Sequence, residues 1–154
     1  IDGEFQDERY WEQYEKEVNE WLKVEPLEIS ENVCVIGFRG GEFAVFPDLF
    51  LSKEYWEEGI ERMKQINPQI RFEVHTDDEI LAKQFFPDFK IIHDVGLNWR
   101  SMRFAKYAII ANSSFYIFPR WVSKGVTIAP RWWGRRNIKT WALPSNFYKR
   151  FLHI

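Results

Sequence analysis

The fold of this chain is decided by one stretch, Val33-Cys34-Val35-Ile36-Gly37-Phe38-Arg39-Gly40-Gly41-Glu42-Phe43. Its apolar first half is rich in β-branched and aromatic residues, which predicts a buried strand of a parallel sheet. The carboxyl end of such a strand lies where open α/β folds bind ligands. Arg39 places a permanent forked cation there, and Gly40-Gly41 allow a ligand to approach the backbone. The stretch predicts a site for an anion such as phosphate; the alternative is a surface arginine beside a flexible turn.

Length and composition predict one folded domain, residues 1–154. The chain is 45% hydrophobic and 29% charged, which is typical of a globular protein and excludes a disordered one. No apolar stretch has membrane-spanning length and no signal peptide is recognisable, so we expect a cytoplasmic protein. Because the sequence begins at Ile1 without a methionine, we expect either a piece of a longer protein or a chain whose first residues, Ile1-Asp2-Gly3, are foreign to it.

Charge is distributed unevenly along the chain. Residues 1–94 contain all 23 acidic residues and 10 basic ones, a net charge of −13, whereas residues 95–154 contain 11 basic residues and no acidic one, a net charge of +11. A basic segment without carboxylates favours anionic partners such as nucleic acid, anionic lipid or a nucleoside diphosphate. The alternative is that the two oppositely charged halves pack against each other.

Periodicity predicts a leading amphipathic helix over residues 8–23, followed by strands that alternate with helices. The expected strands are 33–38, 70–75, 89–93, 108–111 and 125–129. The expected helices are one that follows Ser52, one from the capping-box segment 76–79 to about Phe86, one over 98–107 and one that begins near Phe115. Such alternation predicts a Rossmann-like parallel sheet flanked by helices, with right-handed crossovers and an irregular aromatic tail.

Polar residues follow the expected strands, at the edge of the sheet where all carboxyl ends meet. The segments are Arg39-Gly40-Gly41-Glu42, Thr76-Asp77-Asp78, His93-Asp94, Asn112-Ser113-Ser114 and Arg131-Trp132. Ser113 and Ser114, with the first amides of the next helix, predict an anion site, to which Arg39 adds a bidentate cation. Asp77 or Asp78 could accept hydrogen bonds from a guanine. The alternative is that Asp77, Asp78 and Ser113 only cap helices.

Five segments, in order along the chain, resemble motifs of one enzyme family. They are Gly3-Glu4-Phe5-Gln6-Asp7-Glu8-Arg9-Tyr10-Trp11, 37–43, Phe72-Glu73-Val74-His75-Thr76-Asp77-Asp78, Ile109-Ile110-Ala111-Asn112-Ser113-Ser114-Phe115 and Ile128-Ala129-Pro130-Arg131-Trp132-Trp133. Together they are similar to the α-1,2-fucosyltransferases and their GDP-fucose-dependent relatives. The fourth segment is the closest match, to the family pattern Ile-Ile-Ala-Asn-Ser-Thr-Phe. This family has the GT-B fold of two Rossmann-like domains. The resemblance implies that the chain is the C-terminal, donor-binding half of such an enzyme; the alternative is a diverged short relative.

The resemblance implies a glycosyltransferase that moves the sugar of a GDP-sugar, GDP-fucose above all, to a carbohydrate hydroxyl with inversion. No metal or other cofactor is required in this family. The positions that correspond to donor-binding residues are Arg39, Gly40, Gly41, Asp77, Asp78, Asn112, Ser113, Ser114 and Phe115. Arg39 would bind the β-phosphate and stabilise the charge that develops on it. Glu42 is the candidate general base.

The resemblance departs from the family pattern at three positions of its second segment. Gly37 stands where the family has a histidine, Gly40 where it has a second arginine, and Glu42 where it has an aspartate. These departures leave open a noncatalytic nucleotide-sugar-binding module. The basic, tryptophan-rich segment 131–136 leaves open a module that binds single-stranded nucleic acid. Adjacent Asp77-Asp78 and scattered histidines disfavour an Asp-x-Asp metal site, and no phosphate-loop motif of NTPases is present.

Overall fold

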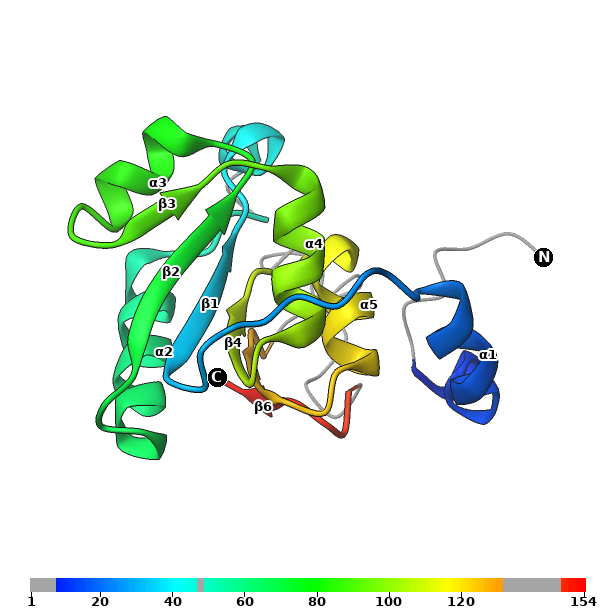
Figure 1. Cartoon of the computed structure of the whole chain (residues 1–154). Helices are drawn as coiled ribbons and strands as arrows, with labels where there is room; N and C mark the ends of the chain where they lie inside the picture. Colours follow the sequence, from blue (N-terminus) through cyan, green and yellow to red (C-terminus); the bar gives the residue numbers. More distant parts are fainter. Residues whose placement is uncertain (1–7, 47–48, 132–147) are drawn as a thin grey trace.

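The computed structural model describes residues 8–46, 49–131 and 148–154. The strands are β1 Val33–Phe38, β2 Arg71–Thr76, β3 Lys90–Ile92, β4 Tyr107–Ile110, β5 Val126–Ala129 and β6 Leu152–His153. They form one six-stranded sheet in the order β3-β2-β1-β4-β5-β6, and every pair is parallel (Figure 1). The prediction of a Rossmann-like parallel sheet flanked by helices is therefore confirmed.

Strand β1 occupies the centre of this sheet, as its apolar sequence requires. All six of its residues are buried, and it pairs with β2 on one side and with β4 on the other. The chain builds the sheet outward from β1 through β2 to β3, and then returns to add β4 on the opposite side of β1. The strand order therefore reverses between β1 and β4, which makes their carboxyl ends the topological switch point of the fold.

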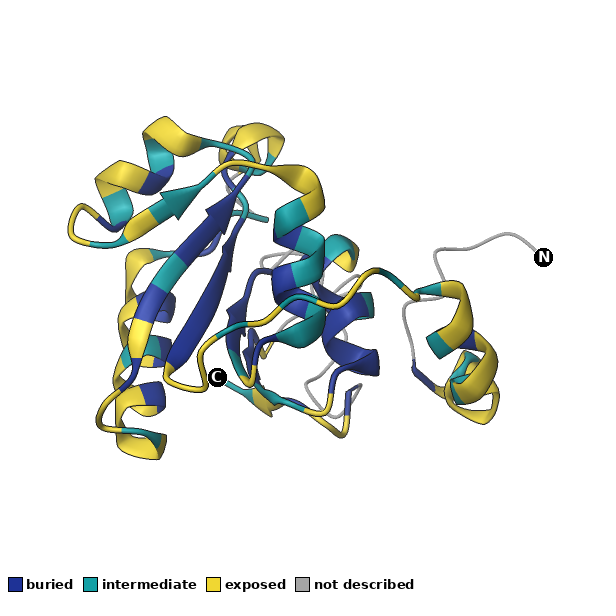
Figure 2. Cartoon of the chain, viewed as in Figure 1, coloured by how far each residue is buried: buried dark blue, intermediate teal, exposed yellow. Residues whose placement is uncertain are grey.

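Helices cover both faces of the sheet. They are α2 Lys53–Ile66, α3 Glu79–Phe85, α4 Val95–Phe104 and α5 Ser114–Val122. In Figure 1, α2 lies behind the sheet, and α4 and α5 lie in front of it. Because β1-α2-β2 and β2-α3-β3 advance in the same direction, right-handed crossovers place α3 on the same face as α2. Figure 2 shows the result: the central strands are mostly buried, and the exposed residues lie on the outer turns of the helices and on the connecting segments.

The predicted helix over residues 8–23 is wrong in part. Residues Glu8–Tyr10 and Glu12–Tyr14 form short 3₁₀ turns, η1 and η2, and only Glu15–Trp21 forms an α-helix, α1. Glu8 explains the difference, because its carboxylate is buried and accepts hydrogen bonds from the Trp121 indole and from the backbone N–H of Lys149. A buried carboxylate held by two distant groups fixes this segment by tertiary contacts instead of helical periodicity.

The predicted boundaries of β1 to β5 agree with the structure to within one residue, and three larger differences concern α4, α3 and the last strand. Helix α4 spans Val95–Phe104 instead of residues 98–107; it begins earlier because Asp94 caps it by accepting from the N–H of Leu97 at 2.7 Å, and it ends earlier because Tyr107 begins β4. The cap of α3 is Asp78 and not Thr76. Strand β6 was not predicted; it follows the tail segment 132–147, which lies outside the described residues, and two residues carry no alternating pattern.

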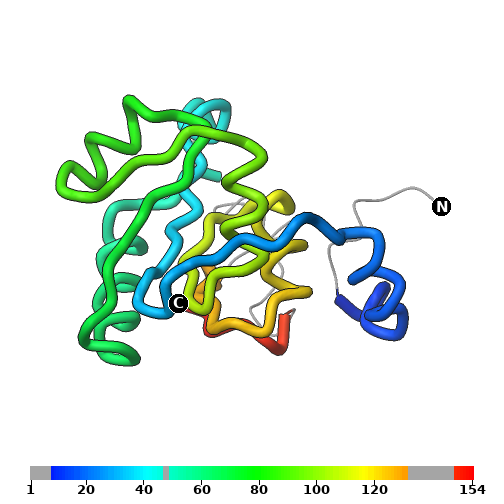
Figure 3. Tube along the Cα trace, viewed as in Figure 1, coloured from blue at the N-terminus to red at the C-terminus, as the bar shows by residue number. Residues whose placement is uncertain are grey.

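An extended segment, residues 22–32, connects α1 to β1. Figure 3 traces its path across the face that carries α4 and α5. Arg100 of α4 holds it there, because the guanidinium donates to the carbonyls of Glu25 and Pro26 at 3.1 and 2.8 Å. Lys106 pairs with Glu31 at 2.9 Å near the end of the segment. The N-terminal turns are thereby tied to the front layer of the domain.

Candidate functional site

Register pairing brings the ends of three strands together. Phe38 of β1 is paired with Thr76 of β2, so Arg39 and Asp77 are the next residues along two adjacent strands. On the other side, Gly37 is paired with Ile110 of β4, which places Asn112 level with Arg39. The structure therefore brings together three of the polar segments that the sequence predicted at this edge.

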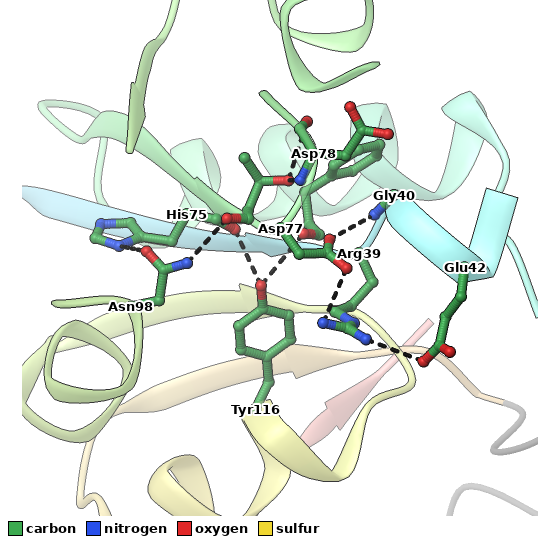
Figure 4. A network of polar contacts seen from close by, with 10 residues as sticks. Arg39, Gly40, Glu42, His75, Asp77, Asp78, Asn98 and Tyr116 are labelled. Carbon is green, nitrogen blue, oxygen red and sulfur yellow. Dashed lines mark hydrogen bonds and ion pairs between the residues drawn. The ribbon is translucent and has the colours of Figure 1, made fainter. Parts of the chain in front are cut away.

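Arg39 is held at this edge by two carboxylates. Its Nη1 lies 2.9 Å from Oδ2 of Asp77, and its Nη2 lies 3.4 Å from Oε1 of Glu42 (Figure 4). The guanidinium also lies over the ring of Phe43, 5.0 Å from its centroid. Its Nε is buried and has no hydrogen-bond partner among the described residues. Arg39 is thus an edge cation with one donor to spare, and not a solvated surface arginine.

The two aspartates that follow β2 have different contacts. Oδ1 of Asp77 accepts from the backbone N–H of Gly40 at 2.9 Å, while Oδ2 pairs with Arg39. Oδ1 of Asp78 accepts from the N–H of Leu81 at 3.0 Å and caps α3. For Asp78, the capping alternative is the contact that the structure shows. The pairing of Asp77 with Arg39 was not anticipated from the sequence, and the predicted contacts of both aspartates with guanosine stay predictions.

Close packing explains why glycines follow Arg39. A Cβ atom on Gly40 would lie 2.6 Å from Cβ of Asp78, and one on Gly41 would lie 2.7 Å from Oδ2 of Asp77. Gly41 also has a φ of 31°, which residues with a side chain rarely adopt. The side chains of Asp77 and Asp78 therefore lie directly against the Gly40-Gly41 backbone. The predicted close approach of a ligand to this backbone stays a prediction.

The segment after β4 begins helix α5. Asn112 is buried; its Nδ2 donates to the carbonyl of Leu49 at 3.1 Å, and its Oδ1 has no partner among the described residues. Ser113 occupies the N-cap position without a side-chain capping hydrogen bond, and Ser114 is exposed in the first turn. Phe115 packs against Trp99, with ring centroids 5.5 Å apart. The carbonyl of Ser113 accepts from the N–H groups of Tyr116 and Ile117, so only the first two N–H groups of α5, those of Ser114 and Phe115, have no acceptor within the helix at the positive end of its dipole.

Tyr116 is a central residue that sequence reasoning missed. Its buried hydroxyl lies 3.2 Å from the carbonyl oxygen of Phe38 and 3.1 Å from that of His75, so it joins the ends of β1 and β2. Burial raises the pKa of Tyr116, and the Asp77 carboxylate raises it further, so the hydroxyl keeps its proton and donates. Gly37 was the available signal: a Cβ there would lie 3.0 Å from the Tyr116 ring, and mid-strand glycines often mark such close approach.

His75 belongs to a second buried network beside the site. Nδ2 of Asn98 donates to the carbonyl of Thr76 at 3.0 Å, so the Asn98 Oδ1 faces Nδ1 of His75, also at 3.0 Å. Since this oxygen can only accept, Nδ1 of His75 carries the proton. Its Nε2 is buried and unpaired among the described residues. Burial lowers the pKa of His75, partly opposed by the hydrogen bond to Asn98, so the ring is neutral at neutral pH.

The remaining predicted members of this edge contribute less. His93 is exposed, and Asp94 caps α4. Of the basic segment 131–136, only Arg131 lies within the described residues, where it is exposed. Within the described ranges, no group of three or more His, Cys, Asp or Glu residues could hold a metal ion, and no helix is long and apolar enough to cross a membrane.

Comparison with known proteins adds no closer classification. No protein-family model matches the chain, and no curated protein matches it. The most specific class that these observations show is therefore the fold: an α/β domain with a six-stranded, all-parallel, Rossmann-like sheet.

Proposed function

We propose that this chain binds a GDP-sugar, GDP-fucose above all, and transfers the sugar to a carbohydrate hydroxyl with inversion. The observation that supports the proposal is the juxtaposition at the switch point. Arg39-Gly40-Gly41 follows β1, Asn112-Ser113-Ser114 follows β4, and these two strands are paired neighbours at which the strand order reverses. Open parallel sheets bind their ligands at this point.

The donors at this point have the chemistry that a diphosphate requires. Arg39 offers a guanidinium that can bind a phosphate through two hydrogen bonds. Backbone N–H groups of a glycine turn and of a helix N-terminus bind phosphate oxygens without adding charge to the protein. Gly40-Gly41 and the nine-residue helix α5 supply both kinds at adjacent strand ends.

In the proposed reaction the acceptor oxygen forms a bond to the anomeric carbon of the donor sugar while the bond from that carbon to the β-phosphate oxygen breaks. The electron pair of the broken bond leaves with GDP, and a carboxylate takes the proton of the acceptor hydroxyl. Glu42 is the candidate for this base because its carboxylate is exposed at this edge of the sheet, and inversion requires that it reach the acceptor on the side of the sugar opposite the phosphate. Negative charge grows on the β-phosphate, and loss of one preorganised donor to such charge typically costs roughly 3–4 kcal/mol.

The resemblance to fucosyltransferases extends the proposal to the whole enzyme. In that family, two Rossmann-like domains form the GT-B fold, and the C-terminal domain binds the donor. The present chain would be this donor half, and a second domain would supply the acceptor side. The proposed transfer uses no metal, because Arg39 and backbone amides take the place of a cation at the diphosphate.

One observation favours a second candidate, a nucleotide-sugar-binding module without catalysis. The family histidine and second arginine correspond to Gly37 and Gly40. A Cβ at Gly37 would lie 2.7 Å from Cε of Met102, and a Cβ at Gly40 would lie 2.6 Å from Cβ of Asp78. Neither position has room for a side chain, so the groups that the family uses there have no equivalent at the same positions.

Both candidate functions require that the chain bind GDP at Arg39, and calorimetric titration with GDP, UDP and ADP tests this requirement. We expect GDP to bind to the wild type, UDP and ADP to bind much more weakly, and Arg39→Ala to abolish GDP binding. Arg62→Ala is the matched control, since Arg62 pairs with Glu58 on the exposed side of α2 and should not affect binding. Equal GDP affinities of wild type and Arg39→Ala would refute the phosphate role.

GDP release separates the two candidates. A transferase incubated with GDP-fucose and a carbohydrate acceptor, together with its partner domain, releases GDP and forms a fucosylated product. A noncatalytic module binds GDP-fucose, and its melting temperature rises with GDP and GDP-fucose, but it releases no GDP. Product formation that is lost in Arg39→Ala would decide in favour of transfer.

A further inference from the structure

The Asp77 carboxylate contacts the same hydrogen-bond donors, the Gly40 N–H and the Arg39 guanidinium, that the proposed function assigns to phosphate. Its Oδ1 accepts from the N–H of Gly40 at 2.9 Å, and its Oδ2 pairs with Nη1 of Arg39 at 2.9 Å. The same Oδ2 is the nearest atom to the Cβ that Gly41 lacks, at 2.7 Å. One carboxylate therefore contacts the guanidinium and covers the glycine backbone at the same time (Figure 4).

This arrangement matches the donor set of an anion site. A guanidinium and a backbone N–H donate hydrogen bonds to carboxylate oxygens and to phosphate oxygens alike, and at similar distances. The carboxylate does not use the whole arginine, because Nε of Arg39 is buried without a partner among the described residues. Arg39 thus retains donor capacity beyond what Asp77 takes.

We propose that Asp77 is an internal competitor of the bound ligand: its carboxylate occupies the anion position at Gly40 and Arg39, and a phosphate group must displace it to bind. The proposal rests on the proposed function for the identity of the ligand as a nucleoside diphosphate. It replaces the predicted role of Asp77 as a guanosine contact with one in which Asp77 sets the affinity of the phosphate position.

Glu42 provides a matched control for this proposal. It is the second carboxylate beside Arg39, but it lies farther away, at 3.4 Å, and its side chain is 73% exposed, against 28% for Asp77. Both Asp77→Asn and Glu42→Gln remove one negative charge next to Arg39. Only Asp77→Asn removes the charge of the carboxylate that also accepts the hydrogen bond of the Gly40 N–H.

The experiment is calorimetric titration of the full 154-residue chain with inorganic pyrophosphate and with GDP. We expect Asp77→Asn to bind pyrophosphate more tightly than the wild type, by about 5- to 150-fold if the carboxylate and the ligand interact as strongly as two coupled ligands usually do. Glu42→Gln should change the affinity much less, and Arg39→Ala combined with Asp77→Asn should abolish binding. Equal gains from Asp77→Asn and Glu42→Gln, or no gain from Asp77→Asn, would overturn the proposal.

A second measurement guards against a misfolded variant. In the wild type, the amide resonance of Gly40 should shift as pyrophosphate saturates the site, because its acceptor changes from carboxylate to phosphate. An unchanged Gly40 resonance at saturation would overturn the proposal without any variant.

The two ligands separate this proposal from the proposed function. If Asp77→Asn binds pyrophosphate more tightly but GDP no better than pyrophosphate, the competitor role stands and the nucleotide function fails. If the wild type prefers GDP but Asp77→Asn gains nothing, the function stands and the competitor role fails.

Discussion

Two arginines at opposite ends of the sheet have different partners: neutral oxygens surround Arg120, whereas carboxylates pair with Arg39. Arg120 lies at the amino end of β4 and β5 and is fully buried, and each hydrogen bond of its guanidinium within the described residues goes to a neutral oxygen. Its Nε donates to Oγ1 of Thr127 at 2.8 Å, and its two Nη atoms donate to the backbone carbonyls of Met102, Ala105 and Val126. Arg39 lies at the carboxyl edge, is partly exposed and is paired with carboxylates.

The contrast separates a cation that stabilises the fold from one that is available to a ligand. Burial lowers the pKa of Arg120 to about 10, yet the group stays charged because neutral oxygens surround its fork. Three of those oxygens are backbone carbonyls and the fourth is the buried hydroxyl of Thr127, so none of them can move away to admit another anion. The partners of Arg39 are side chains at the protein surface, which can rotate away when another anion takes their place.

The largest effect in this comparison is expected for Arg120→Met. The substitution keeps an apolar stem but leaves several buried acceptors without a donor, which should lower the free energy of unfolding by about 3 kcal/mol or more. Urea unfolding measures this loss. Arg62→Met, on an exposed pair, should cost about 0.5 kcal/mol or less; a similar loss in both variants would contradict the structural role of Arg120.

The next effect is expected at the carboxyl edge, for Tyr116→Phe. Its hydroxyl is the buried donor to the carbonyls of Phe38 and His75, so the substitution should cost about 1–2 kcal/mol of unfolding free energy. Tyr14→Phe is the control, because Tyr14 is 49% exposed on η2. A Tyr116→Phe variant as stable as the wild type would show that the hydroxyl does not join β1 to β2 in solution.

Arg39→Ala should change stability less than either of these. Its ion pairs are partly exposed and screened, so we expect a loss of about 1 kcal/mol or less in the free energy of unfolding. The same variant should lose GDP binding, as proposed above. If Arg39→Ala destabilised the chain as much as Arg120→Met, the distinction between the two arginines would be wrong.

The smallest effect is a pH dependence that arises from His75. Since folding lowers the pKa of His75, the unfolded chain binds the proton more readily than the folded chain does. The contribution of neutral His75 to the free energy of unfolding is therefore fully present above the unfolded pKa of about 6.5, and it is lost as the pH falls through the folded pKa. Urea unfolding between about pH 8 and pH 5 should show this decline. His75→Gln should flatten it, and His93→Gln, at an exposed position, should not.

The central strands and their parallel direction were predictable because their signals are local. The apolar run of β1 and the strands that alternate with helices already imply a parallel sheet, and the structure confirms the alternation of strands and helices from β1 to β5. Parallel direction places Arg39, Asp77 and Asn112 at one edge of the sheet. The strand order, which makes β2 and β4 the two neighbours of β1, was not predicted and comes from the structure.

The parts that failed depend on contacts between residues distant in sequence. The helical spacing at 8–23 cannot indicate that Glu8 becomes buried against Trp121. Nor can the Thr76-Asp77-Asp78 sequence indicate which aspartate caps a helix and which pairs with Arg39, because both are good caps by type. Such choices are made by packing at the strand ends and have no local signal.

The buried carboxylate of Glu8 has a consequence for the order of folding. Its hydrogen bond with the N–H of Lys149 joins residues 141 positions apart, so it closes a loop of almost the entire chain. The entropy cost of so long a loop delays the contact until nearer contacts have formed. We therefore expect the central strands to assemble first, and the N-terminal turns and the last strand to dock together as the final step.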